Sequence, residues 1–363
     1  MHLTSLTLLN FKNYDHFEGN FSPKINCFVG NNGIGKTNIL DSIHYLAFCK
    51  SYFNAIDSQN IKHNEPFFMI KGSFKLENDD LELQCSVKRN QKKIFKRNQI
   101  EYEKLSDHIG TLPLVMISPA DNELINGASE LRRKFIDGII CQYNRSYLDN
   151  LIQYNQALKQ RNALLRNFYE QNYFDKESLG IWTEQLINFG IKIIEARNNF
   201  LEEFIILFNT NYGIISSSKE VVSLKYLKSI TNNFNDELNN CLSKDRTQLV
   251  TTVGPHKDDL EFLINNYSIK KFASQGQQKS YLLALKLSQY EFIKNKKLIK
   301  PVLLLDDIYD KLDEARFNCL IDLVGAENFG QVFITDTHPL RINQLMNNKR
   351  IDSKVFEIEK IKL

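Results

Sequence analysis

The sequence predicts an α/β fold built from both ends of the chain, with a mostly helical section inserted between them. Short β-like runs dominate the first part of the chain, which also contains a helical pattern at residues 38–48. The long amphipathic stretches at 129–169 and 182–209 contain no proline, as uninterrupted helices require. Short strand and helix patterns then return toward the C-terminus. We therefore divide the chain into residues 1–117, 118–244 and 245–363.

Length and composition agree with this division. At 363 residues the chain exceeds the usual size of a single hydrophobic core. Apolar residues make up 42% and charged residues 25%, which is an ordinary balance for a globular protein. The 46 Lys and Arg residues nearly match the 43 Asp and Glu residues, so the net charge of +3 identifies no partner. A nucleic-acid site must therefore rest on local basic clusters.

The sequence also predicts a cytoplasmic protein without a membrane partner. Its apolar runs are far shorter than the roughly 20 residues of a membrane span. The N-terminus lacks the basic and apolar segments of a secretory signal. The cysteines show no C-x-x-C pair and no nearby His at zinc spacing, so we expect reduced thiols rather than a metal site.

The segment GNNGIGKTN, at residues 30–38, follows the apolar run INCFVG and precedes the first helical pattern. It matches the pattern G-x-x-x-x-G-K-[ST] of phosphate-binding loops. Glycines let backbone N–H groups turn toward phosphates, and the following helix adds a positive dipole. We expect Lys36 to reach the terminal phosphates and Thr37 to bind Mg²⁺. The predicted nucleotide-binding residues are Gly30, Asn31, Asn32, Gly33, Ile34, Gly35, Lys36 and Thr37.

The segment PVLLLDD, at residues 301–307, has the apolar character of a buried strand and ends in two acids. In P-loop ATPases such a Walker B strand supplies an acid that holds Mg²⁺ and a residue that orients the attacking water. We assign the first role to Asp306 and the second, catalytic role to Asp307, with Lys36 as the other catalytic residue. A core strand that ends in a solvated acidic turn is the alternative. No N-K-x-D guanine motif is present, which argues against a GTPase.

The segment FASQGQQKSYLLALKL, at residues 272–287, opens a long helix and resembles the signature loop of ABC ATPases. In those proteins the loop contacts the γ-phosphate held by the opposite subunit, through a hydroxyl, a glycine N–H and the helix dipole. A polar helix cap without further function is the alternative. DKLDEAR resembles the D-loop, with Asp313 near the subunit interface, and His338 or Thr335 stands where a switch residue is expected. The predicted signature residues are Ser274, Gln275, Gly276 and Gln277.

The order of these motifs, with a short helical insertion, resembles the RecF family in the SMC-like branch of ABC ATPases. The likeness extends over nearly the whole chain. It implies an ABC-type P-loop ATPase head, formed by residues 1–117 and 245–363, with residues 118–244 as an inserted, mostly helical second lobe. The motifs that carry it are LTLLNFKNY, GNNGIGKTNILDSIHYL, ISPADNELINGASELRRKFID, QYNQALKQRNALL, TTVGPHKDDLEF, FASQGQQKSYLLALKL and PVLLLDDIYDKLD.

By the same resemblance the protein binds ATP with Mg²⁺, forms a homodimer when ATP is bound, and binds DNA at gaps and at junctions of single strand and duplex. The family acts with RecR and RecO to help load RecA, which implies a role in replication-linked repair and the SOS response. Lys12 and Asn13 of NFKNY would approach the ATP. The alternative is the cytosolic ATPase subunit of a transporter, against which the helical insertion argues. A fused nuclease would need more than the 25 residues that follow His338.

The sequence departs from common ABC ATPases at some positions. Asp307 stands where many of them have Glu, and the shorter acid predicts slow ATP turnover, as in a switch rather than a motor. No clear Q-loop glutamine is present, so Ser118 and Asp121 are the candidates for coupling residues. The segment GPHKDD fits the resemblance, but the sequence indicates no role for His256 and Lys257.

The clearest basic cluster is VKRNQKKIFKRNQ, at residues 87–99. On a β-hairpin it would neutralise DNA phosphates, giving salt-sensitive binding without sequence reading. A hairpin edge that lysines protect from aggregation is the alternative. Arg132, Arg133 and Lys134 form a second candidate, although the two arginines can instead pair with acids. The first cluster comprises Lys88, Arg89, Lys92, Lys93, Lys96 and Arg97.

Overall fold

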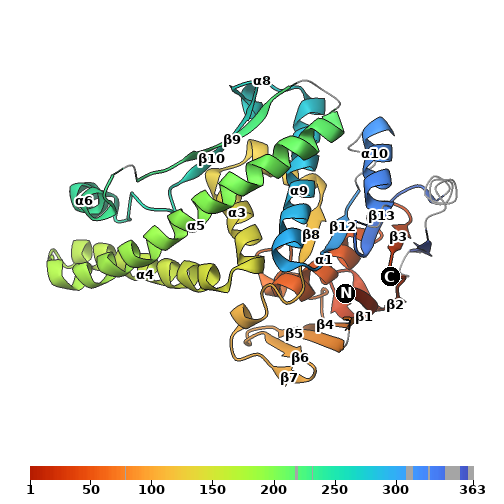
Figure 1. The fold of residues 1–363 in the computed structure, drawn as a ribbon. Helices are drawn as coiled ribbons and strands as arrows, with labels where there is room; N and C mark the ends of the chain where they lie inside the picture. Colours follow the sequence, from red (N-terminus) through yellow and green to blue (C-terminus); the bar gives the residue numbers. More distant parts are fainter. Residues whose placement is uncertain are drawn as a thin grey trace. The chain divides into compact units, whose positions relative to one another are not determined.

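The computed structural model describes residues 1–77, 79–216, 220–230, 232–307, 314–325, 328–339 and 352–358. The chain forms two compact units (Figure 1). No helix in the described part of the chain combines the length and the apolarity of a membrane span. Unit 1 comprises residues 1–121, 214–217 and 279–363, and unit 2 comprises residues 122–213 and 218–278.

A parallel sheet joins the two ends of the chain in unit 1. Strand β3 (Ile25–Val29) pairs with β13 (Val332–Asp336) on one side and β14 (Ser353–Glu357) on the other. Strand β12 (Val302–Leu305) lies between β13 and β8 (Leu114–Ile117). The segments INCFV, VLLL and VFITD are buried at every position, as in parallel sheets covered on both faces. Their carboxyl ends meet at one edge, where open α/β sheets bind ligands.

An antiparallel sheet forms the second layer of unit 1. Buried and half-buried residues alternate along its central strands, so that one face packs against the core. Its order is β2-β1-β4-β5-β6-β7. The strands are β1 (His2–Phe11), β2 (Tyr14–Asn20), β4 (Phe67–Lys75), β5 (Asp80–Lys88), β6 (Ile94–Arg97) and β7 (Ile100–Glu101).

Helix α1 (Lys36–Phe48) packs into the same core as both sheets. One buried cluster contains Ile43 of α1, Leu83 of the antiparallel sheet and Leu304 of the parallel sheet. Burial of each such side chain stabilises the fold by about 1.5–3 kcal/mol. Cys27 and Cys85 are buried free thiols within this unit. The other helices in the described part of unit 1 are η1 (Asp57–Asn60), η2 (Leu105–Asp107), η3 (Pro119–Asn122, whose last residue belongs to unit 2), most of α9 (Gln275–Lys297) and α10 (Glu314–Gly325).

Unit 2 combines long helices with a small antiparallel sheet. The helices α3 (Ser129–Tyr143), α4 (Arg145–Glu170) and α5 (Lys176–Ser216) follow one another along the chain, and the side chain of Asn144 caps α4 by accepting the N–H of Tyr147. The predicted α/β fold with an inserted, mostly helical lobe is thus confirmed. The sheet has the order β11-β10-β9, with β9 (Val222–Leu227), β10 (Asp259–Ile264) and β11 (Tyr267–Ser268). The short helices are α2 (Glu123–Asn126), α6 (Phe234–Asn240), α7 (Leu242–Gln248) and α8 (Ile269–Phe272).

The structure groups residues 245–278 with unit 2, whereas the sequence-based division placed them with the C-terminal part of the chain. The reason is a long-range pairing. Strand β10 lies antiparallel to β9, with Leu260 opposite Tyr226, which holds this segment in the lobe. Spacing and composition carry no signal for a pairing between strands so far apart in sequence.

Candidate nucleotide-binding site

The predicted phosphate loop connects β3 to α1 in unit 1. Gly30, Gly33 and Gly35 have φ angles of 149°, 77° and 114°, which side chains rarely tolerate. At Gly35 a Cβ atom would also lie only 2.5 Å from the side-chain amide of Asn13. The loop therefore needs glycine both for its turns and for its close contacts. Of the remaining loop residues, Asn31 and Asn32 are exposed and Ile34 is buried.

Lys36 opens α1, and its ammonium group folds back over the loop. Nζ donates to the carbonyl oxygens of Gly30 at 2.7 Å and Asn31 at 2.9 Å. Because the side chain is only 7% exposed, it is already held in place above the loop backbone. A phosphate at the N-terminus of α1 would meet both the positive helix dipole and this ammonium group.

Lys12 and Asn13, predicted beside the nucleotide, make different contacts. The Asn13 amide donates to the carbonyl oxygen of Ile34 at 2.9 Å, and its oxygen accepts from Asn38 at 2.7 Å. Asn13 thus braces the phosphate loop against the first turn of α1. The Nζ atom of Lys12 lies 2.6 Å from the Asp41 carboxylate, which the first turns of α1 supply. Asn13 therefore contacts the phosphate loop, and Lys12 contacts the helix that follows it.

Asp306 follows β12, and its carboxylate accepts hydrogen bonds from hydroxyl groups of distant segments. Thr37 donates to its Oδ1 atom at 2.8 Å and Thr335 donates to the same atom at 2.9 Å. Ser118 lies 3.5 Å from Oδ2. Burial raises the pKa of the Asp306 carboxyl, and the hydrogen bonds from Thr37 and Thr335 oppose that rise. The predicted Walker B acid and the predicted Mg²⁺ ligand of the loop are therefore adjacent.

This donor set fits Mg²⁺. The Thr37 hydroxyl and the Asp306 carboxylate are hard oxygen ligands, and Mg²⁺ usually binds through one or two protein oxygens together with water and phosphate. A cation there would also stabilise the charged form of a carboxylate that burial now disfavours.

Thr335 of β13 contacts both predicted Walker B acids. Its hydroxyl donates to Asp306 and accepts the backbone N–H of Asp307 at 2.9 Å. The threonine is 2% exposed, so this arrangement is fixed by packing. Asp307 itself has a φ angle of 47°, a left-handed conformation that is uncommon outside glycine. A single buried hydroxyl thus sets the position of the turn that carries the predicted catalytic acid.

The two candidates for the switch residue differ in their surroundings. His338 is exposed, and its backbone N–H donates to the Asp336 carboxylate at 2.7 Å. Thr335, in contrast, lies within the acidic site. The predicted D-loop residue Asp313 lies outside the described residues.

Lys286 of α9 is a buried cation that sequence analysis missed. Its Nζ atom lies 2.6 Å from the Asp121 carboxylate and donates to the carbonyl oxygen of Met116 at 3.0 Å. Asp121 also accepts the N–H of Ser118 at 2.8 Å and the hydroxyl of Tyr52, whose pKa is raised by burial and then by Asp121. The cluster lies at the carboxyl end of β8, so it ties α9 to the acidic edge of the sheet. The one available signal was a lone lysine in the apolar run YLLALKLSQY.

The predicted signature residues form the N-terminus of α9. Ser274 and Gln277 make a reciprocal capping box, because the Gln277 N–H donates to the Ser274 hydroxyl at 3.2 Å and the Ser274 N–H donates to the Gln277 side chain at 2.7 Å. Gln277 also donates to Glu220 at 2.6 Å. Ser274 and Gln275 are exposed, and Gly276 is half-buried. Ser274 therefore caps α9, and this end of the helix is exposed on unit 2.

The basic hairpin of β5 and β6 divides into exposed and engaged side chains. Lys93 is 13% exposed, and its Nζ atom lies 2.7 Å from Asp57 and donates to the carbonyl oxygen of Cys49 at 2.5 Å. Lys93 therefore holds the hairpin to the region after α1. Arg89 donates to the carbonyl oxygen of Glu65 but stays exposed. Lys88, Lys92 and Arg97 are exposed as well, and Lys96 is half-buried.

The second basic candidate is engaged within unit 2. Arg132 forms a two-point ion pair with Asp259, at 2.7 and 3.0 Å. Arg133 donates to the carbonyl oxygen of Asp258 at 2.5 Å, and Lys134 pairs with Glu130 at 2.6 Å. Arg132 thus pairs with an acid, as in the alternative that the sequence left open, whereas Arg133 contacts a backbone carbonyl oxygen.

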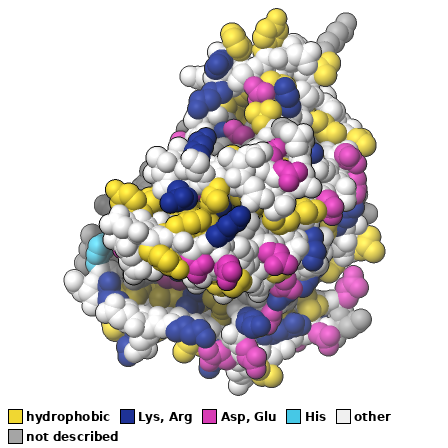
Figure 2. Space-filling view, turned by 90° about the vertical axis from the view of Figure 1, so that its left-hand side faces the viewer, with side chains coloured by type: hydrophobic (Ala, Val, Ile, Leu, Met, Phe, Trp, Pro, Cys, Tyr) yellow, Lys and Arg dark blue, Asp and Glu magenta, His cyan; other side chains and the backbone are white. Residues whose placement is uncertain are grey.

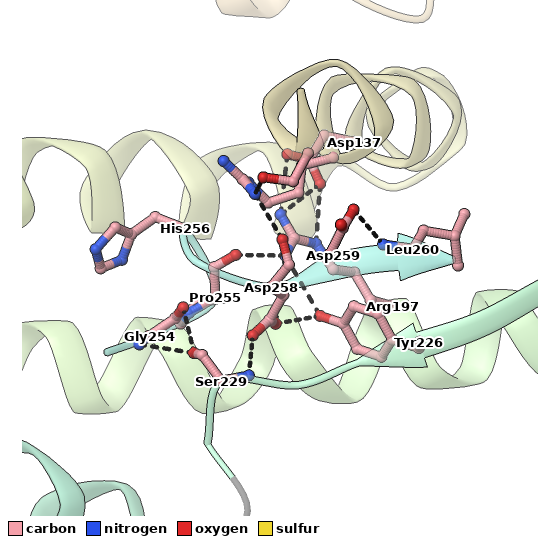
Figure 3. A network of polar contacts seen from close by, with 12 residues as sticks. Asp137, Arg197, Tyr226, Ser229, Gly254, Pro255, His256, Asp258, Asp259 and Leu260 are labelled. Atoms are coloured by element: carbon pink, nitrogen blue, oxygen red, sulfur yellow. Dashed lines mark hydrogen bonds and ion pairs between the residues drawn. The ribbon is translucent and has the colours of Figure 1, made fainter. Parts of the chain in front are cut away.

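The segment GPHKDD joins the entry of β10 to the long helices of unit 2 (Figure 3). Asp258 is fully buried and accepts the Ser229 N–H at 2.7 Å and the hydroxyl of Tyr226. Arg197 of α5 donates to the carbonyl oxygen of Pro255 at 2.8 Å and pairs with Asp137 of α3 at 2.9 Å. The network therefore fixes α3, α5 and the sheet against one another.

His256 and Lys257 of this segment have different surroundings. The Nε2 atom of His256 lies 3.0 Å from the Thr251 carbonyl oxygen, which can only accept, so Nδ1 accepts from the Tyr154 hydroxyl at 2.6 Å. Burial lowers the pKa of His256 to about 4, which makes the ring a neutral structural group. Lys257 is exposed.

The chain matches the model of the family described as RecF/RecN/SMC N terminal domain over residues 2–359. A protein of Flavobacterium johnsoniae named DNA replication and repair protein RecF is 49% identical over 99% of this chain and 100% of its own length. A protein of the same name from Phocaeicola vulgatus is 46% identical, over 99% of this chain and 97% of its own.

Solved structures agree with these sequence relationships. The structure titled recombination mediator protein RecF-ATP in RecFOR pathway has a TM-score of 0.87 and 31% identity, and the match covers 93% of this chain and 92% of that chain. A crystal structure of an Smc head bound to the C-winged helix domain of ScpA matches with a TM-score of 0.58 and 16% identity. The second likeness concerns the fold alone.

Proposed function

The chain belongs to the RecF/RecN/SMC N-terminal domain family of ATPases, and on this premise we propose that it is an ATP-dependent DNA-binding protein of replication and recombinational repair. The observation that carries the proposal is the composite site of unit 1. The phosphate loop comes from the N-terminal part of the chain, and its Thr37 meets Asp306 of the C-terminal part at 2.8 Å. High identity to RecF proteins along the whole chain favours repair over the transporter alternative.

ATP is the nucleotide that this site suits, since a solved relative is titled as its ATP complex. Loop N–H groups and the N-terminus of α1 would hold the phosphates, and Lys36 would turn from the loop carbonyls toward them. Thr37 and Asp306 would hold Mg²⁺, which when bound supplies charge neutralisation to the phosphates.

Slow hydrolysis would follow from the position of Asp307. Its carboxylate would orient a water molecule and polarise its O–H bond, while Thr335 holds the backbone of the turn. Aspartate reaches less far than the glutamate found in many ABC ATPases. The site therefore suits an ATPase that works as a release switch.

Dimerisation on ATP would use the N-terminus of α9. Ser274 presents a hydroxyl at an exposed helix end, and the half-buried Gly276 follows it in the first turn. Such a helix end binds anions, and the γ-phosphate on a second copy of the chain is the anion that the resemblance implies. The closed dimer would then bind DNA, aided by the exposed cations of the β5–β6 hairpin.

RecR and RecO are the partners that we propose for this function, because the solved relatives are titled as parts of the RecFOR pathway. Gapped DNA and junctions between duplex and single strand are the proposed substrates. Assistance to RecA loading and a part in the SOS response follow from the same family resemblance.

The test is nucleotide-dependent binding of gapped DNA by the full chain. Lys36→Met removes the cation that the loop holds over the phosphate position, so we expect ATP to lose its effect on DNA affinity. Lys24→Met is the matched control, because Lys24 is an exposed lysine of the same unit. If Lys36→Met binds gapped DNA with the same ATP dependence as Lys24→Met, the proposed mechanism is wrong.

A further inference from the structure

Unit 2 contains a pocket that the ATPase site does not use. The pocket has a volume of about 790 Å³ and is lined by the end of α4, the turn after it, α6 and α7. This volume falls in the range of roughly 300–1,000 Å³ that is usual for ligand sites. Its base is the small apolar cluster that includes Leu165 and Phe168, with Leu242 packed against it. Figure 2 faces the end of unit 2 that carries α4 and α6, where hydrophobic side chains lie among Lys and Arg side chains.

Aromatic rings form one wall of this pocket. Tyr169 is 69% exposed and Tyr173 is 59% exposed, although both are large enough to prefer burial. Phe168 holds the wall in place, with its ring centroid 6.0 Å from that of Tyr173 and 5.5 Å from that of Phe174, both edge to face. Large exposed rings, one of them held by a neighbouring ring as Tyr173 is, are suited to stacking against flat ligands.

Helix α7 contributes a cation, Arg246, to the lining of the pocket. The Arg246 guanidinium lies 4.2 Å from the centroid of the Phe174 ring, which keeps it beside the aromatic wall. Lys244 is exposed on the same helix. The only acid of α7, Asp245, is fully buried and pairs with Arg161 at 2.7 Å. Helix α7 therefore directs its cations to the surface and its acid inward, and no acid is among the described residues that line the pocket.

Amide and hydroxyl side chains complete the lining. Asn239 and Asn240 end α6, and Ser243 and Thr247 lie on α7. Such groups can donate to and accept from the edges of nucleobases. A pocket for an apolar peptide anchor would be lined mainly by aliphatic side chains, which contribute only Leu165 and Leu242 here.

We propose that this pocket binds the bases of single-stranded DNA. Bases would stack on Tyr169 and Tyr173, while Arg246 neutralises the neighbouring backbone phosphate. The inference rests on the proposed DNA function and adds to it a single-strand site in unit 2, separate in sequence from the basic hairpin of unit 1. Through this site the protein would bind the unpaired strand of a gap.

The test compares a labelled oligo-dT strand with an abasic strand of the same length, because both carry the phosphates and only one carries bases. Fluorescence anisotropy with the full chain should show tighter binding of oligo-dT. The Tyr169→Ala/Tyr173→Ala variant should lose that preference, with oligo-dT affinity falling roughly 5- to 100-fold. Tyr169→Phe/Tyr173→Phe should keep it, because the rings remain.

Duplex DNA of equal length separates this inference from the proposed function. The alanine variant should bind duplex like the wild type, and its thermal unfolding should change little because both tyrosines are largely exposed. If the wild type binds duplex and gapped DNA but does not prefer oligo-dT over the abasic strand, only the pocket assignment is overturned. Retention of the preference by the alanine variant overturns the pocket assignment as well. Absence of all DNA binding overturns both proposals.

Discussion

The ammonium group of Lys286 lies 2.6 Å from the carboxylate of Asp121, and both side chains are only 6% exposed. One residue comes from α9 and the other from the segment that follows β8. The N-terminus of α9 carries the predicted signature loop, and Asp121 also holds the backbone of Ser118, whose hydroxyl lies beside Asp306. A buried ion pair therefore joins α9, which carries the predicted signature loop, to the acidic edge of the candidate nucleotide site.

Removal of one partner of this pair should destabilise the protein strongly. Lys286→Met leaves the Asp121 carboxylate buried without its cation, and such changes cost about 3–5 kcal/mol. Urea unfolding of the variant should show a correspondingly lower free energy of unfolding. The Lys286→Met/Asp121→Asn double variant is the control, since it removes both charges while the amide oxygen can still accept the Ser118 N–H, and it should recover much of the stability. An unaltered unfolding midpoint for Lys286→Met would show that the pair does not form.

Loss of the Thr335 hydroxyl should slow ATP hydrolysis more than it weakens ATP binding. Thr335→Val removes a hydrogen bond to Asp306 and the hydroxyl that accepts the Asp307 N–H, so the turn that carries the predicted catalytic acid loses this contact. We expect kcat to fall roughly tenfold or more, equivalent to at least about 1.4 kcal/mol in the barrier. Thr335→Ser keeps the hydroxyl and should retain most activity. Steady-state kinetics in which Val and Ser variants behave alike would contradict this role.

The two functions assigned to Ser274 can be separated by its substitutions. Ser274→Ala removes the cap of α9, which should cost about 1 kcal/mol of stability. Ser274→Asp keeps a good cap, so its thermal unfolding should match the wild type, but its negative charge would repel a γ-phosphate on a second subunit. Sedimentation with ATP should therefore show the Asp variant as a stable monomer. A stable Asp variant that dimerises normally would restrict Ser274 to its capping role.

Buried histidines should make the protein less stable in mild acid. Burial lowers the pKa of His44, His108 and His256 to about 4 in each case. The unfolded chain, with histidine pKa values near 6.5, therefore binds more protons than the folded chain between pH 6.5 and 4. Stability is complete above this window and falls as the pH drops through it, by up to about 1.4 kcal/mol per pH unit for each histidine.

The His256→Gln variant isolates one of these contributions. Its free energy of unfolding should depend less steeply on pH between 6.5 and 4 than that of the wild type. The raised pKa of Asp306 has the opposite effect on stability, because it favours the folded state as the pH falls. This effect is the same in the variant and the wild type, so it cancels when the two proteins are compared. Identical slopes in urea titrations across this range would contradict a neutral buried His256.

Lysines of the basic hairpin should fall into two groups. Lys88→Ala/Arg89→Ala/Lys92→Ala removes exposed cations, so the affinity for duplex DNA should fall. The slope of log Kd against the logarithm of the salt concentration should also decrease, by about 0.9 for each phosphate that the variant no longer neutralises. Lys93→Ala should instead reduce stability, because Lys93 pairs with Asp57. Salt titrations and thermal unfolding of both variants measure the two effects. An equal drop in DNA affinity from Lys93→Ala in a fully folded protein would contradict this division.

Local signals predicted the segments that the structure brings together in the candidate nucleotide site. The glycine spacing before Lys36 and the acid-ended strand before Asp306 each reflect a backbone or ligand requirement that acts within a few residues, and the sheet then brings them together. The α/β fold class followed from the same local patterns. The signature segment was identified as a helix start, and the capping box of Ser274 and Gln277 gives the physical reason for that start.

Long-range contacts were beyond the sequence patterns. The pairing of β9 with β10, the ion pair of Lys286 and the network around Arg197 each join segments far apart in the chain. The hydrophobic periodicity around a lysine in an apolar helix, or an arginine in an amphipathic helix, does not indicate which residue it pairs with. Thr335 was considered only as a switch residue, because nothing in VFITDTH reveals that its hydroxyl would contact both Walker B acids.

ATP on one chain joins two copies of the protein in the mechanism that we propose. Analytical ultracentrifugation of the full chain with ATP, with ADP and without nucleotide tests it most directly, with Lys36→Met measured in parallel. We expect a dimer with ATP, monomers in the other two conditions, and a monomeric Lys36→Met variant throughout. A wild-type protein that sediments identically in all three conditions would contradict it.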